Sequence, residues 1–334
     1  INMFISRQFS KITYSAFFTA KRNHQVAVVG ATNEVGQTTA LLLRTCPSVS
    51  KLVLHDTTDS TPGVVLDLSH IPSKSKAKGY CGRNTLEEAL EGSSLVLAVG
   101  GLPQKSLTTS QSILSQNADF IKIVASAVTR IAPVPFFGIA TEPINTLVPM
   151  AVEVMRHQGC YEQNKLFGVT IIDALKAQTL YAKANGFVHN ECHVPVICGH
   201  SKETMVPLLS QASPKTVLPE EKCQDLTNTL RDFTIYEKAS SPLTPALSIA
   251  YSVYLFTQRI LEAIDGQISQ VNALVENNDF GTSYFSGLVE VNKNGIGEMR
   301  LYSNLFSYEC GILEESIRQL REDVTVGKKI LEIV

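Results

Sequence analysis

The sequence lacks the patterns that mark several classes of protein. No two of its seven cysteines form a CxxC pair, which argues against a disulfide framework and a zinc knuckle, so we expect no metal. A reducing compartment is the simplest interpretation. The net charge is −2 without a basic block, so a nucleic-acid partner has no electrostatic support. No apolar run approaches the roughly 18 residues that span a bilayer, and we expect no association with a membrane.

The first 33 residues contain no acidic side chain, because Glu34 is the first one along the chain. This stretch is rich in Ser, Thr and Phe, and its cations are Arg7, Lys11, Lys21 and Arg22. A basic, hydroxyl-rich and acid-free composition is typical of a mitochondrial transit peptide. We therefore predict a transit peptide over residues 1–23 and a location in the mitochondrial matrix. An ordinary disordered tail is the alternative.

From residue 24 onward, segments with the pattern of strands alternate with segments with the pattern of helices. This alternation predicts βαβ units and a parallel sheet covered on both faces. The fold class is then α/β, with a doubly wound Rossmann domain over residues 24–165 and an α+β substrate and dimer lobe over 166–334. We expect strands at 25–30, 50–56, 95–101, 136–145, 193–200 and 286–302, and helices at 35–46, 86–94, 118–133, 145–159, 245–264 and 313–334.

A glycine turn follows the first strand. Gly30, Asn33 and Gly36 have the spacing at which a dinucleotide fold places its glycines, and the helix after them would direct free N–H groups toward a pyrophosphate. Asp56 ends the second strand, where a carboxylate would accept hydrogen bonds from the adenosine ribose. We predict NAD as the cofactor.

Two residues of this turn depart from the usual pattern. Asn33 stands where a middle glycine would let the backbone approach the phosphates, although asparagine tolerates a positive φ. Glu34 places a negative charge beside a pyrophosphate, unless its side chain points to solvent. We expect NAD binding to be weakened.

Four stretches carry a resemblance to a known family. They resemble malate dehydrogenase of the mitochondrial type, and the resemblance extends from about residue 25 to the C-terminus. It implies a homodimer that oxidises L-malate to oxaloacetate with NAD. The stretches are GATNEVGQTTALLL, LHDTTDSTPGVVLDLSHI, NKLFGVTIID and VPVICGHSKETMVPLLSQ.

The resemblance implies roles for particular residues. His200 matches the family's proton acceptor and Asp173 its carboxylate partner. A neutral imidazole would remove the hydroxyl proton, and the carboxylate would fix its tautomer and stabilise imidazolium. Gly101 and Asn117 are further candidates for contact with NAD.

The substrate positions of the family are altered. Two arginines of its mobile loop are replaced by Gln104 and Thr109, and a third is replaced by Lys176. Glu142 stands where the family has an asparagine that hydrogen-bonds the substrate. An Arg–carboxylate contact in a dry site contributes on the order of 2–4 kcal/mol, so these losses predict much weaker catalysis.

Three functions remain open at the level of the sequence. The first is a malate dehydrogenase-like protein with lost or strongly reduced malate:NAD oxidoreductase activity. It would keep the fold and act as a structural or regulatory partner, as a homodimer or as a heterodimer with a related subunit. The second is an active NAD-dependent dehydrogenase of L-malate or another 2-hydroxy acid that uses His200 and Asp173. The third is an unrelated role in binding RNA or protein, and nothing in the charge pattern supports RNA.

Overall fold

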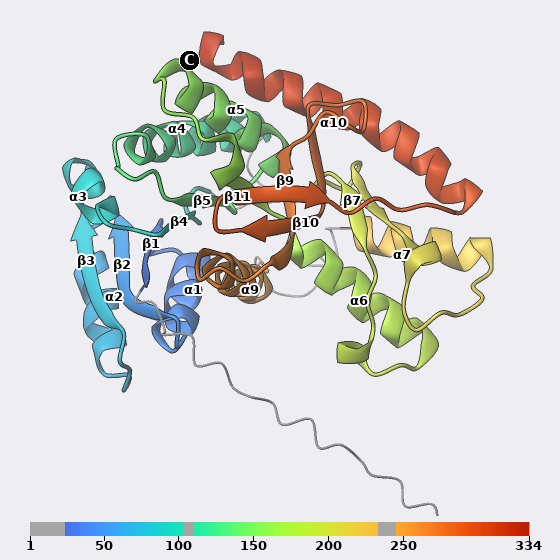
Figure 1. The fold of residues 1–334 in the computed structure, drawn as a ribbon, viewed down its shortest axis with the longest axis horizontal. Helices are drawn as coiled ribbons and strands as arrows, with labels where there is room; N and C mark the ends of the chain where they lie inside the picture. The colour runs from blue at the N-terminus through green and yellow to red at the C-terminus, as the bar shows by residue number, and fades with distance from the viewer. Residues whose placement is uncertain (1–23, 103–109, 233–244, 334) are drawn as a thin grey trace, which may run out of the picture.

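The computed structural model describes residues 24–102, 110–232 and 245–333. Figure 1 shows the N-terminal strands, in blue, at one end of the molecule and the C-terminal strands, in orange to red, near its middle, and these strands belong to one sheet. The parallel strands are β1 (His24–Val29), β2 (Val49–Asp56), β3 (Lys76–Cys81), β4 (Leu95–Ala98), β5 (Phe136–Ile139) and β6 (Leu166–Val169). The remaining strands are β7 (Val196–Cys198), β8 (Met205–Pro207), β9 (Ser269–Glu276), β10 (Tyr284–Asn292) and β11 (Gly295–Met299).

The parallel strands lie in the order β3-β2-β1-β4-β5-β6. This is the order of a doubly wound dinucleotide-binding sheet, in which ligands bind beyond the carboxyl ends of the strands. Strand β9 then joins β6 in the antiparallel sense, and β10, β7 and β8 follow. The sheet is continuous across the predicted division between residues 165 and 166, which stays a prediction.

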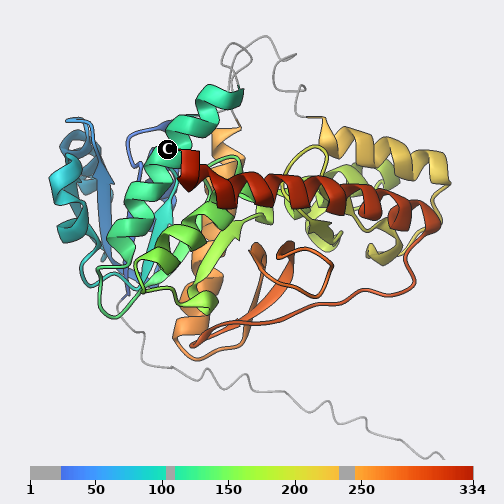
Figure 2. The ribbon, with the colours of Figure 1, turned by 90° about the horizontal axis from the view of Figure 1, so that it is seen from above.

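Helices cover both faces of the sheet, as the alternating pattern predicts. They are α1 (Glu34–Arg44), α2 (Thr61–Ser69), α3 (Leu86–Leu90), α4 (Ser110–Val128), α5 (Ile144–His157), α6 (Ile171–Asn185), α7 (Glu220–Arg231), α9 (Ala246–Ile264) and α10 (Ser307–Ile333). Helices α1, α2 and α9 pack on one face, and α3, α4, α5 and α10 pack on the other. Figure 2 shows α10 lying across the molecule, from α4 and α5 at one end toward α7 at the other.

Strand β1 explains why the sheet is buried on both faces. Val26 and Val28 belong to the core beneath α1 and α9, whereas Ala27 and Val29 belong to the core beneath α4 and α5. Successive side chains of a strand point to opposite faces, so a continuous apolar run serves both cores. None of the helices in the described part of the chain is long and apolar enough to cross a bilayer.

Candidate active site

The first turn of the fold requires its two glycines. Gly30 has a φ of +87°, and a Cβ atom there would lie 2.2 Å from the Cα atom of Gly100. At Gly36, in the first turn of α1, a Cβ atom would lie 2.2 Å from the carbonyl oxygen of Gly30. Strand β1, helix α1 and the loop after β4 therefore meet closely only because these side chains are absent.

Asn33 is the N-cap of α1. Its Oδ1 accepts a hydrogen bond from the backbone N–H of Gly36 at 2.7 Å, and its Nδ2 donates one to the carbonyl of Val99 at 2.9 Å. The φ of Asn33 is −78°, so the turn does not use the positive φ that the sequence argument invoked. The Asn33 side chain thus accepts a hydrogen bond from an N–H group that the N-terminus of a helix could otherwise donate to an anion.

Asp56 lies at the end of β2, next to the same turn. Its Oδ2 accepts hydrogen bonds from the backbone N–H of Thr32 at 3.0 Å and from the Thr32 hydroxyl at 2.6 Å. Its Oδ1 accepts from the N–H of Thr57 at 2.7 Å. The sequence predicts that the Asp56 carboxylate accepts hydrogen bonds from the ribose. In the structure it already accepts three hydrogen bonds from this chain.

Gly101 and Asn117 fix the loop that follows β4. Gly101 has a φ of +91°, and a Cβ atom there would lie 2.6 Å from Oδ1 of Asn117. The Asn117 side chain is buried, accepts from the N–H of Leu102 at 2.7 Å, and donates to the carbonyls of Leu102 and Glu142 at 3.0 and 2.7 Å. These bonds give Asn117 a structural role, while its contact with a cofactor stays a prediction.

His200 lies between two carboxylates. Its Nδ1 lies 2.6 Å from Oδ2 of Asp173, which is buried in the first turn of α6. Its Nε2 lies 2.6 Å from Oε1 of Glu142, which comes from the loop between β5 and α5. The structure thus brings together His200 and Asp173, as the sequence predicts, and adds Glu142 on the opposite ring nitrogen.

The charge of His200 follows from this arrangement. Burial lowers the pKa of His200, but the charges and hydrogen bonds of Asp173 and Glu142 outweigh burial and raise the pKa to about 10. The ring is therefore an imidazolium at neutral pH. Oδ1 of Asp173 has no hydrogen-bond partner among the described residues.

Asn145 positions the His200 loop, and the sequence reasoning missed it. Its Oδ1 accepts the backbone N–H of His200 at 2.8 Å, and its Nδ2 donates to Thr204 at 3.0 Å and to Asp323 of α10 at 2.9 Å. Burial raises the pKa of Asp323. The sequence offered one signal for this role, because Asn145 is a polar residue at the start of an apolar helix. It could not identify the partner Asp323, which is 178 residues away.

Cys198, two residues before His200, holds an unusual backbone conformation. It is fully buried and has a φ of +85°, a region that residues with a Cβ atom rarely adopt. Burial raises the pKa of the Cys198 thiol to about 12. The thiol is therefore a packing group rather than a nucleophile.

Comparisons with known proteins agree with this fold. Residues 24–168 match the lactate/malate dehydrogenase NAD binding domain, and residues 170–331 match the alpha/beta C-terminal domain of the same family. The chain is 32% identical over 332 residues to the mitochondrial malate dehydrogenase of Pongo abelii, covering 98% of each protein. The chain belongs to the lactate/malate dehydrogenase family.

Solved structures of this family share the fold. A malate dehydrogenase from Cryptosporidium parvum superposes with a TM-score of 0.75 at 23% identity, covering 92% of this chain and 100% of that one. A lactate dehydrogenase from Eimeria maxima, solved with NADH and oxamate, gives a TM-score of 0.78 at 17% identity, covering 95% and 98%.

The family's domain over residues 24–168 is an NAD binding domain, and most residues of the turn after β1 fit that cofactor. Because Gly30 has no side chain, the backbone can turn tightly before the N-terminus of α1. Asp56 lies beside that turn. The fit is incomplete at Asn33, whose own side chain takes the Gly36 N–H.

The structure describes two of the four residues that stand at the family's substrate positions. Gln104 and Thr109 lie outside the described residues. Lys176 is half-buried on α6, one turn after Asp173. Glu142 contacts His200 directly. Within residues 24–102, 110–232 and 245–333, no group of three or more His, Cys, Asp or Glu side chains is arranged to hold a metal ion.

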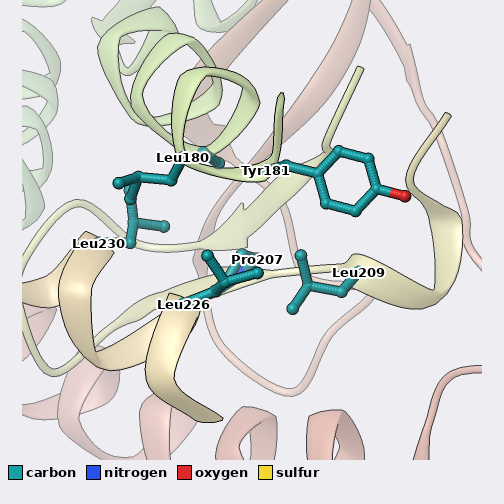
Figure 3. Close-up of a pocket in the computed structure, with 7 residues that line it drawn as sticks. Leu180, Tyr181, Pro207, Leu209, Leu226 and Leu230 are labelled. Atoms are coloured by element: carbon teal, nitrogen blue, oxygen red, sulfur yellow. The ribbon is translucent and has the colours of Figure 1, made fainter. Parts of the chain in front are cut away.

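A small apolar pocket lies away from this site, among α6, α7 and β8. Figure 3 shows the leucine side chains that line it, from α6, from α7 and from Leu209 just after β8. None of its lining residues belongs to the His200 site. They are Ala177, Leu180, Tyr181, Pro207, Leu209, Leu226 and Leu230.

Proposed function

We propose that this chain is a mitochondrial malate dehydrogenase-like protein whose malate:NAD oxidoreductase activity is lost or strongly reduced. The observation that carries the proposal is the contact between Glu142 and Nε2 of His200. This nitrogen is the atom that exchanges a proton with a 2-hydroxy or 2-oxo acid when a His–Asp pair performs that chemistry.

Both directions of the reaction depend on the state of this nitrogen. Oxidation of malate requires a neutral His200 that accepts the hydroxyl proton, and an imidazolium has no free lone pair for it. Reduction of oxaloacetate requires the imidazolium to donate its Nε2 proton to a carbonyl oxygen, and Glu142 accepts at that same nitrogen. NAD, when bound, supplies the hydride acceptor for the oxidation.

Electrostatic repulsion also disfavours the binding and turnover of malate and oxaloacetate. Malate and oxaloacetate are dianions, and Glu142 brings a further negative charge to the site. Lys176 provides a cation in place of a substrate arginine, but as a point charge and not as a planar fork. Loss of bidentate contacts worth on the order of 2–4 kcal/mol each would lower kcat/KM by about 10³-fold or more.

The test is steady-state reduction of oxaloacetate with NADH by the purified protein. We expect kcat/KM to lie at least about 10³-fold below the range of about 10⁴–10⁸ M⁻¹s⁻¹ that enzymes commonly reach. The His200→Ala variant is the control for any residual rate. An ordinary rate that disappears in this variant would overturn the proposal.

The second candidate is a working NAD-dependent dehydrogenase of L-malate or another 2-hydroxy acid. The observation that favours it is the 2.6 Å contact between Asp173 and Nδ1 of His200, together with Asp56 at the nucleotide turn. A panel of 2-hydroxy acids with NAD, again with His200→Ala as control, separates the two candidates.

Location and assembly are part of the same proposal. The relative from Pongo abelii is named as mitochondrial, and we propose the mitochondrial matrix for this chain, tested by fractionation of cells. We also propose a homodimer or a heterodimer with a related subunit. Helices α1, α2 and α9 carry the exposed apolar side chains Leu41, Leu66, Leu247 and Tyr251, and sedimentation velocity measures the assembly.

A further inference from the structure

Glu142 is held in place at three points. Its Oε1 lies 2.6 Å from Nε2 of His200, and its Oε2 accepts a hydrogen bond from the N–H of Ile144 at 3.3 Å. Its carbonyl oxygen accepts from Nδ2 of the buried Asn117 at 2.7 Å. Both the side chain and the backbone of Glu142 are therefore oriented by neighbours, which distinguishes it from a surface glutamate that samples solvent.

The two short contacts of His200 constrain where its protons lie. A neutral imidazole carries one N–H group and can donate to one carboxylate only, whereas an imidazolium donates to both. A neutral ring would satisfy both contacts only if one of the two carboxyl groups, Asp173 or Glu142, carried the second proton. Imidazole is a much stronger base than a carboxylate, so the proton belongs on His200.

The charged groups around the ring come from several elements. Asp173 faces it from α6, Glu142 faces it from the loop before α5, and Asp323 of α10 lies behind Asn145. Lys176 follows Asp173 on α6. The two carboxylates in direct contact outnumber the single positive charge of the ring, so the centre of the site is already negative without a ligand.

We propose that Glu142 is a specificity-determining residue that takes the place of a substrate oxygen at Nε2 of His200 and thereby closes the site to dicarboxylates. This proposal rests on the function proposed above, and it names the residue and the ligand class concerned. Glu142 supplies the hydrogen-bond acceptor that a 2-hydroxy or 2-oxo acid would bring. A dianionic ligand must displace a carboxylate from a buried imidazolium and then remain beside that carboxylate.

The experiment follows the ionisation of His200 in the full-length protein by the ¹⁵N chemical shifts of labelled histidine rings. The chain has seven histidines, and the His200→Gln variant identifies the signal. We expect both ring nitrogens of His200 to show protonated shifts at pH 8. We expect Glu142→Gln to lower the apparent pKa of the ring by at least one unit.

The matched control is Glu91→Gln, because Glu91 is an exposed glutamate of the N-terminal domain. It should leave the titration of His200 unchanged. A neutral His200 ring at pH 8 in the unaltered protein would overturn the proposal. So would equal titrations of the Glu142→Gln and Glu91→Gln variants. If Glu142→Gln does not fold, the spectrum of the unaltered protein and the Glu142→Asn variant decide the question.

A second readout addresses the ligand class. Calorimetry with oxaloacetate in the presence of NAD should show no saturable binding to the unaltered protein and measurable binding to Glu142→Gln. Equal binding by both would contradict the exclusion of dicarboxylates. These results are independent of turnover. A neutral ring in an inactive protein would remove this inference and leave the proposed function, whereas an ordinary rate with oxaloacetate would overturn both.

Discussion

Oε1 of Glu142 lies 2.6 Å from Nε2 of His200, on the opposite side of the ring from Asp173. The same pattern recurs at the nucleotide turn, where Asn33 occupies the N–H of Gly36 and Thr32 donates to Asp56. Groups that the sequence predicts to meet a ligand thus form hydrogen bonds within the chain itself. Such contacts stabilise the protein without a ligand and compete with ligand binding.

Two helical glycines give opposite responses to the same substitution. Gly36 and Gly63 are each the third residue of a helix. A Cβ atom at Gly36 meets the Gly30 carbonyl, whereas at the exposed Gly63 it meets nothing within 4 Å. We expect Gly36→Ala to lower the free energy of unfolding by about 1–3 kcal/mol, and Gly63→Ala to raise it by about 0.5–1 kcal/mol. Urea titration measures both, and equal effects would show that the turn is not tightly packed.

Because Cys198 has a positive φ, we expect a glycine variant at this position to be more stable than an alanine variant, the reverse of the usual order. Cys198→Gly and Cys198→Ala both remove the buried thiol, but only alanine keeps a Cβ atom at a φ of +85°. The glycine variant should be more stable by about 1 kcal/mol. Cys192, buried with a φ of −90°, is the matched position at which alanine should be the more stable. The same order at both positions would argue against strain at Cys198.

The raised pKa of His200 makes the stability of the protein depend on pH. A group with a pKa of 6.5 in the unfolded chain and about 10 in the folded one stabilises the fold fully below pH 6.5. This contribution is lost as the pH rises toward 10, by up to about 1.4 kcal/mol per pH unit. The difference in unfolding free energy between the unaltered protein and His200→Gln should therefore shrink from pH 6.5 to 10. A constant difference over this window would contradict an imidazolium at His200.

The nucleotide turn should bind NAD better when Asn33 and Glu34 are replaced. The double variant Asn33→Gly, Glu34→Gly frees the N–H of Gly36 and removes a charge from the first turn of α1. We expect a lower Kd for NAD by calorimetry, and a loss of only a few tenths of a kcal/mol at the N-cap. Tight binding by the unaltered protein would show that Asn33 does not compete with the phosphates.

Local patterns in the sequence predict much of the fold. The apolar run of β1, the glycine turn and Asp56 at the end of β2 are all found in the structure. Helix α2 was missed because Pro62 and Gly63 hide its start, and β3 because it is a polar strand at the edge of the sheet. Neither segment has the clear periodicity on which such predictions depend.

The site was predicted less completely, because its contacts join remote segments. The sequence placed Glu142 near the substrate, but its position on Nε2 of His200 depends on how the loops after β5 and β7 meet. The bond from Asn145 to Asp323 spans 178 residues and requires α10 to pack against α5. Motif spacing carries no information about such pairs.

The most direct measurement of the central claim compares two proteins in one assay of oxaloacetate reduction with NADH. One is the unaltered protein, and the other carries Gln104→Arg, Thr109→Arg, Glu142→Asn and Lys176→Arg. We expect the variant to gain at least about tenfold in kcat/KM, since it regains Arg–carboxylate contacts and frees Nε2 of His200. The gain should disappear on adding His200→Ala. An ordinary rate in the unaltered protein, or no gain in the variant, would contradict the claim that these four positions disable the site.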